Sequence, residues 1–324
     1  MARLKALRRS YAPLLLGIFL LVAPHVMSHY QFYVLQKGVQ TAIHVLGLLI
    51  LIGYTGMLSL GSAALLATGA YTYGILSVKL GLSPWLCAVA AVVFTTVVGT
   101  ALAFPSFRLA GPFLVVTTVG FGEIVRILIL NLEPVTGGAY GLAGFQNLLP
   151  TNMWVYHLML VVLLLVAIGT ERLGKSRIGL ALKAIRQDEI AAEVMGVNVK
   201  RAKVVAFALS AMLAGVSGVF LANLTGYMSP DSFTGAESTT FLLMVVISGM
   251  NSAVAAIVSS IILTWLPEVL RFLASSRLLV YALILLVYLR INWVPSTKAA
   301  VTDLIRKLGF GKAGASGESQ VGRG

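Results

Sequence analysis

The sequence predicts an all-α, polytopic membrane protein with about eight to ten transmembrane helices and a charged cytoplasmic segment. Hydrophobic residues make up 58% of the chain and charged residues only 11%, and the mean hydropathy is +0.93. Soluble domains carry about 25% charged residues, so an ordinary soluble domain is excluded. The 324 residues leave room for about ten apolar runs of about 20 residues each.

The charge and cysteine content exclude several other classes. The net charge is +13, but the cations lie at the ends of apolar runs and in loops, where they set membrane orientation rather than bind nucleic acid. Cys87, the one cysteine, lies in an apolar run, which rules out an intrachain disulfide and a thiolate metal site. His25 and His29 are spaced to share a metal, but no third ligand is near, so we interpret them as interfacial side chains.

The first expected span covers about 13–28. The basic residues before it, up to Arg9, place the N-terminus in the cytoplasm. No small-x-small cleavage site follows this apolar run, so we expect it to be retained. The further expected spans are about 39–52, a third ending near 77, 84–104, 112–130, 154–169, 204–224, 239–249, 253–270 and 278–291.

These spans form one membrane domain over residues 1–308, followed by a glycine- and serine-rich segment, 309–324, that is expected to be a disordered cytoplasmic tail. With ten spans, the basic segments fall on one side, as the positive-inside rule requires. The count depends on the glycine-rich stretch Gly53–Gly61. If it is a re-entrant break, the count falls by two and the sidedness of the rest is unchanged.

A charged segment at about 171–203 separates two apolar runs, and both termini and this segment are expected in the cytoplasm. Within it, apolar residues recur at roughly helical spacing, which predicts an amphipathic helix. One interpretation is a docking helix for a soluble partner, and the other is a helix lying in the lipid headgroups with its basic side chains on anionic lipid. The apolar residues are Ala181, Leu182, Ile185, Ile190, Ala192 and Met195.

A motif in this segment resembles a known family. Ile190-Ala191-Ala192, followed after three residues by Gly196, resembles the coupling motif of ABC importer permeases, Glu-Ala-Ala, three residues, Gly. The first position departs from that motif, although glutamates flank it. The surrounding RIGLALKAIRQDEIAAEVMGVNVKRAKVVAFALSAMLAGVSG, with GYTGMLSLGSAALLATGAY, TTVGFGEIVRI and TGGAYGL, resembles the LivM-like permeases of branched-chain amino-acid ABC importers over about 46–270.

The resemblance implies a transport subunit of the bacterial inner membrane rather than an enzyme. Its expected partners are a second, homologous permease (LivH-like), two cytoplasmic ATPases, a periplasmic substrate-binding protein and membrane lipid. The resemblance assigns ATP use to the partner subunits, so no cofactor is expected in this chain. The substrates would be leucine, isoleucine and valine.

The resemblance also assigns residues to coupling with the ATPases, on a helix at about 184–196. Ala191 and Ala192 are small enough for close packing, and Gly196 permits a tight turn at the helix end. Arg186, Asp188 and Glu189 would pair with the ATPase surface.

A second set of residues is expected along the substrate pathway. A helix broken at membrane depth frees backbone N–H and C=O groups that can hold a zwitterion, although glycines also allow close helix packing. From this break come Gly53, Tyr54, Gly56, Ser59 and Gly61, and from the fifth span come Thr117, Thr118 and Glu123.

Glu123 is three residues from Arg126, so the two can also form a purely structural ion pair.

Three alternative functions stay open. A urea or short-chain amide permease shares the same motifs. A stand-alone ion-coupled amino-acid transporter would need carboxylates in several spans, whereas Glu123 is the one clear case. An integral-membrane enzyme would need a cluster of catalytic groups at one membrane face, and none is evident.

Overall fold

The computed structural model describes residues 17, 20–25, 27–107, 111–269 and 286. The chain divides into two units, Met1–Ser275 and Ser276–Gly324. All the elements described below belong to the first unit, and Leu286, an exposed helical residue, is the described part of the second. Part of the expected first span, the expected tenth span apart from Leu286, and the expected disordered tail lie outside the described residues.

Six helices are long and apolar enough to cross a membrane, which confirms the prediction of an all-α polytopic membrane protein. They are α2 (His29–Leu48, continued by the π-helical turn η2, Leu49–Tyr54), α3 (Ser62–Leu80), α4 (Pro84–Leu102), α5 (Pro112–Asn131), α7 (Asn152–Lys175) and α10 (Val199–Thr225). Two shorter helices follow, α11 (Gly235–Ile247) and α12 (Ala253–Val269).

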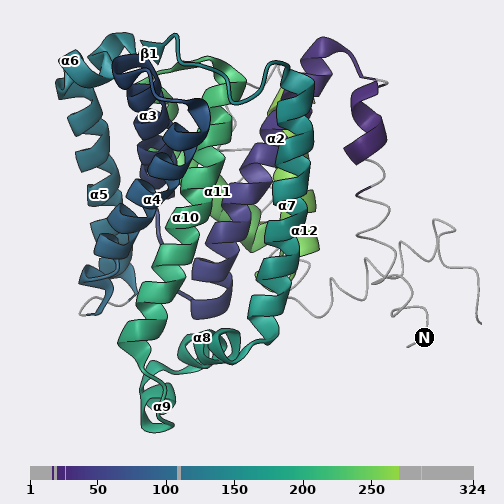
Figure 1. The fold of residues 1–324 in the computed structure, drawn as a ribbon. Helices are drawn as coiled ribbons and strands as arrows, with labels where there is room; N and C mark the ends of the chain where they lie inside the picture. The colour runs from purple at the N-terminus through teal and green to yellow at the C-terminus, as the bar shows by residue number, and fades with distance from the viewer. Residues whose placement is uncertain (1–16, 18–19, 26, 108–110, 270–285, 287–324) are drawn as a thin grey trace, which may run out of the picture. The chain divides into compact units, whose positions relative to one another are not determined.

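The remaining elements connect these helices. At one end of the bundle, the connections contain the short helices within 133–140 and 230–232 and the two-stranded sheet in which Leu142 pairs with Met228. At the other end lie α8 and α9, and Figure 1 shows α8 across the bundle and α9 projecting beyond it. The connecting elements are η1 (Ala23–His25), η3 (Pro105–Phe107), α6 (Glu133–Thr136), η4 (Gly138–Tyr140), β1 (Leu142–Ala143), α8 (Arg177–Gln187), α9 (Glu189–Val194), β2 (Tyr227–Met228) and η5 (Pro230–Ser232).

The bounds expected for the second span, 39–52, are wrong. α2 begins at His29 because Ser28 and Gln31 form a capping box, in which each side chain accepts a hydrogen bond from the other residue's backbone N–H. The polar residues after this cap, expected in a loop, belong to the first turns of α2. Buried polar side chains here find hydrogen-bond partners on other helices. The Gln36 side chain, for example, donates to the Asn152 carbonyl at 3.1 Å.

The two ends of the charged segment expected at 171–203 belong to membrane-spanning helices. α7 continues to Lys175 and α10 begins at Val199, so the charges at both edges lie in the end turns of long helices. Long cationic side chains at helix ends can reach the aqueous interface while their stems stay apolar.

Close helix packing around α10 forms the core of the bundle, and Figure 1 shows α10 running between α4 and α2. Glycines bring the backbones together: a Cβ on Gly69 would lie 2.8 Å from the Cα of Gly215. Small residues drive this kind of approach in membranes, where no hydrophobic effect acts between helices. A buried hydrogen bond also joins α2 to α10, in which the Gln40 side chain donates to the Ser217 hydroxyl at 2.7 Å.

Replacing Gly218 with leucine should therefore disrupt the fold. A Cβ at this position would lie 2.5 Å from the Leu66 carbonyl oxygen and 2.7 Å from the Ala70 nitrogen, and overpacking costs about 1–3 kcal/mol or more. We expect Gly218→Leu to give little monodisperse protein in detergent. Gly120→Leu is the matched control, because among the described residues no atom outside its own helix backbone lies within 4 Å of an added Cβ. Equal yields of the two variants would contradict the packing described here.

Candidate coupling and pathway sites

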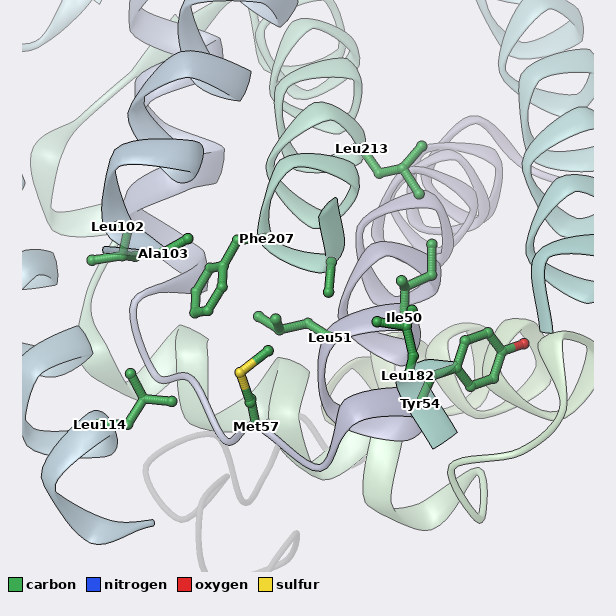
Figure 2. Close-up of a cluster of buried hydrophobic side chains, with 11 residues drawn as sticks. Ile50, Leu51, Tyr54, Met57, Leu102, Ala103, Leu114, Leu182, Phe207 and Leu213 are labelled. Atoms are coloured by element: carbon green, nitrogen blue, oxygen red, sulfur yellow. The ribbon is translucent and has the colours of Figure 1, made fainter. Parts of the chain in front are cut away.

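α8 is fixed to the bundle through a buried hydrophobic cluster. Leu182 is fully buried between η2 and α10, where it lies with Ile50, Tyr54 and Phe207. Figure 2 shows these side chains at the end of α2, with Leu182 beside Tyr54. A rigid shift of α8 must therefore disturb the end of α2.

The docking helix expected over about 184–196 is wrong as a continuous element, because the chain breaks at Asp188. This residue has extended backbone, and its carboxylate accepts hydrogen bonds from the Ile190 and Ala191 amides at 2.9 and 3.0 Å. Asp188 is thus the N-cap of the separate helix α9. After α9, Gly196 has a φ of +86°, which accords with the tight turn expected there.

Exposed apolar side chains lie on α9 and at its C-terminal end, next to the exposed Glu193. Ala192 is buried against Ile185 and Val199, while Ile190, Val194 and Met195 are 77%, 82% and 83% exposed. We call Ile190, Val194 and Met195 the α9 patch. The sequence pattern put Ile190 and Met195 on one apolar stripe with Leu182 and Ile185 and left out Val194. The break at Asp188 changes the helical phase between α8 and α9, so a single stripe does not describe both helices.

Arg186 connects α8 to the end of α2. Its guanidinium donates a hydrogen bond to the Gly53 carbonyl and lies 3.6 Å from the Met250 sulfur, in the turn between α11 and α12. Its side chain also packs on Gly56. Gly53 belongs to the π-helical turn, a geometry that frequently marks functional sites.

Glu189 connects α9 to α10. Its carboxylate lies 2.7 Å from the ammonium group of Lys203, which is 4% exposed and also donates to the Ser106 carbonyl at 3.1 Å. The three ionic residues expected to meet an ATPase therefore have partners within this chain, and their role in coupling stays a prediction. The sequence did not indicate that Lys203 takes part in this site, because its two partners come from other elements of the fold.

The glycine-rich stretch is broken, but the break is shorter than 53–61. Gly53 and Tyr54 belong to the π-helical turn, and the non-helical part covers 56–61. Within it, Gly56 is exposed and Ser59 is 2% exposed. The Tyr54 hydroxyl donates to the Thr170 carbonyl at 3.0 Å, which ties the turn to α7.

Thr118 brings α5 against the far end of this break. Its hydroxyl accepts a hydrogen bond from the Leu60 amide at 3.0 Å, and a Cβ on Gly61 would lie 2.7 Å from its carbonyl oxygen. Thr117 does not join this contact, because its hydroxyl bonds to the Phe113 carbonyl of its own helix.

Glu123 lies away from the break, on an exposed part of α5. Its carboxylate lies 3.4 Å from Nε of Arg126, which confirms the ion pair expected from their spacing. Arg126 also lies 3.6 Å from the carboxylate of Asp231 in η5, a contact that the sequence did not suggest. Whether Glu123 lines a substrate pathway stays a prediction.

These features define a class of protein: a multi-pass membrane protein with a broken helix inside it and a projecting apolar patch linked to that break. Residues 30–289 match the family described as branched-chain amino acid transport system / permease component, and the chain belongs to this family.

Among its relatives, the high-affinity branched-chain amino acid transport system permease protein LivM of Escherichia coli (strain K12) is 36% identical over 298 residues, covering 83% of this chain and 69% of the relative. The protein of that name from Salmonella typhimurium is 36% identical over 299 residues, with the same coverage. The autoinducer 2 import system permease protein LsrC of Enterobacter sp. (strain 638) is 28% identical over 126 residues, 37% of each chain. No solved structure matches.

Proposed function

We propose that this chain is the permease subunit of an ABC importer that carries leucine, isoleucine and valine across the bacterial inner membrane. The family and the LivM relatives support this substrate class over urea or short-chain amides. ATP hydrolysis takes place in two separate cytoplasmic subunits. A periplasmic binding protein delivers the amino acid, and a second, LivH-like permease completes the pathway. Both termini and α9 face the cytoplasm.

The α9 patch is the observation that carries the coupling proposal. These three exposed apolar side chains lie on, or directly after, a helix that projects from the bundle (Figure 1), and they are suited to a cleft in a protein partner. The alternative, burial of the segment in lipid headgroups, fits α8 better, because α8 lies across the bundle and projects less.

Motion of α9 has two routes into the membrane domain. The ion pair of Glu189 with Lys203 passes it to α10, and the hydrogen bond of Arg186 to Gly53 passes it to α2. Each route joins a short helix of the α8–α9 segment to a membrane-spanning helix. Closure of the ATPases would thus shift the ends of two helices that flank the break at 56–61.

Uptake of labelled leucine and labelled urea, measured side by side in cells with and without this gene, tests the substrate. We expect loss of leucine uptake with urea uptake unchanged, and restoration by the gene on a plasmid. Loss of urea uptake with normal leucine uptake would replace the proposed substrate class.

A further inference from the structure

The N-terminus of α3 lies inside the bundle, at about half the depth of its neighbours. Leu65, in the first turn of α3, packs against Ala211 and Ala214, which lie near the middle of the 27-residue α10. The chain reaches this point through the non-helical residues 56–61. Such half-membrane helix starts point their positive dipole ends at anionic substrate groups in several transporter folds.

The partial positive charge of the backbone amides at the start of α3 has no negative charge opposite it among the acceptors described here. The first four N–H groups of a helix lack partners within it and carry partial positive charge. The Ala63 amide donates to the Ser238 hydroxyl of α11 at 3.0 Å, and the Leu65 amide donates to the Gly61 carbonyl at 3.3 Å. Both acceptors are uncharged, so the local positive potential stays uncompensated.

Two buried polar side chains on the elements around this start are unpaired. The Ser62 hydroxyl and both ring nitrogens of His44 have no hydrogen-bond partner within the described part of the chain, and the residues are 1% and 2% exposed. Ser62 is the first residue of α3, and side chains lean toward the N-terminus of their helix. His44 stacks edge-on against Phe241, with ring centroids 4.6 Å apart, one helical turn from Ser238.

Folded proteins seldom leave such groups unpaired, because each costs about 1–3 kcal/mol. We infer that the α3 N-terminus binds the α-carboxylate of the transported amino acid, with the Ser62 hydroxyl as a donor beside the positive end of the α3 dipole. His44, in its neutral form, presents an acceptor nitrogen for the α-ammonium group. This inference rests on the proposed function and adds the substrate group that the break recognises.

The test uses the complete importer, with all its subunits, in proteoliposomes. Ser62→Asp places a fixed carboxylate where the substrate carboxylate would bind, and the helix dipole favours it there. We expect labelled leucine transport to fall by at least about tenfold, while ATP hydrolysis stimulated by the binding protein stays within about twofold. Ser62→Asn separates the effect of charge from that of size, since its side chain is of similar size but neutral, and it should lose clearly less transport than Ser62→Asp.

Wild-type rates of leucine transport in Ser62→Asp, or equal losses in Ser62→Asp and Ser62→Asn, would overturn the carboxylate site. Failure of the wild-type importer to carry leucine in the same liposomes would instead overturn the proposed function, and the inference with it. If the importer with Ser62→Asp does not assemble, the importer with Ser62→Ala tests the carboxylate site instead. Loss of one donor should lower leucine transported per ATP about three- to tenfold, and an unchanged ratio would overturn the site.

Discussion

Aspartate at both Val194 and Met195 is expected to abolish ATPase binding and leucine transport while the chain stays folded in the membrane. Both side chains are more than 80% exposed, so the substitutions disturb no internal packing. In a docked complex they would bury two carboxylates in an apolar contact. Loss of such central contacts costs about 2–4 kcal/mol, or about 30- to 1,000-fold in Kd.

Two quantities are measured. The first is the amount of ATPase that co-purifies with the tagged permease, and the second is the Kd of the purified ATPase for the permease. A double variant with Val194→Ile and Met195→Leu keeps the patch apolar and serves as the control. It should bind the ATPase normally. Normal co-purification and transport by the aspartate variant would remove α9 from the coupling interface.

The second large effect is expected at the ion pair of Glu189 with Lys203. Glu189→Gln leaves the ammonium group of Lys203 buried and without its negative partner, and hydrogen bonds to charged groups contribute about 1.5–3 kcal/mol. The variant should lose thermal stability, and it should also transport less leucine per ATP hydrolysed, because α9 no longer moves α10. Adding Lys203→Met removes the buried charge, so it should restore stability without restoring coupling.

Thermal midpoints and the ratio of leucine transported to ATP hydrolysed separate these two effects. Glu193→Gln is the matched control, because Glu193 is exposed and lies on the same short helix without an ion pair in the described ranges. It should match the wild type in both measurements. A Glu189→Gln importer with wild-type stability and wild-type coupling would show that the pair transmits nothing.

The membrane class followed directly from composition, but the bounds of the helices did not. Polar residues concealed the start of α2, where Gln36 and Gln40 are buried and bonded to α7 and α10. Those partners are more than 100 residues away in the chain, so no local pattern contains them. The glycine-rich break was visible in the sequence, whereas its contact with Thr118 depends on how α5 packs.

For α8 and α9, too, the sequence predicted the local features but not the contacts with the rest of the fold. A motif resemblance located it to within a few residues, and the φ of +86° at Gly196 accords with the expected turn. Its charged residues were expected to face a partner, yet Arg186 and Glu189 are bound within the chain. The apolar α9 patch depends on the phase shift at Asp188, which a single helical period across the segment cannot reproduce.

The most direct test of the central claim is ATP-dependent leucine uptake by proteoliposomes of defined composition. Liposomes with both permeases, the ATPases and the binding protein should accumulate labelled leucine when ATP is supplied to the ATPases. Liposomes lacking this chain, or containing it alone, should accumulate none. Leucine accumulation by this chain alone would contradict the account, because transport would then need neither the α9 patch nor a partner to move it.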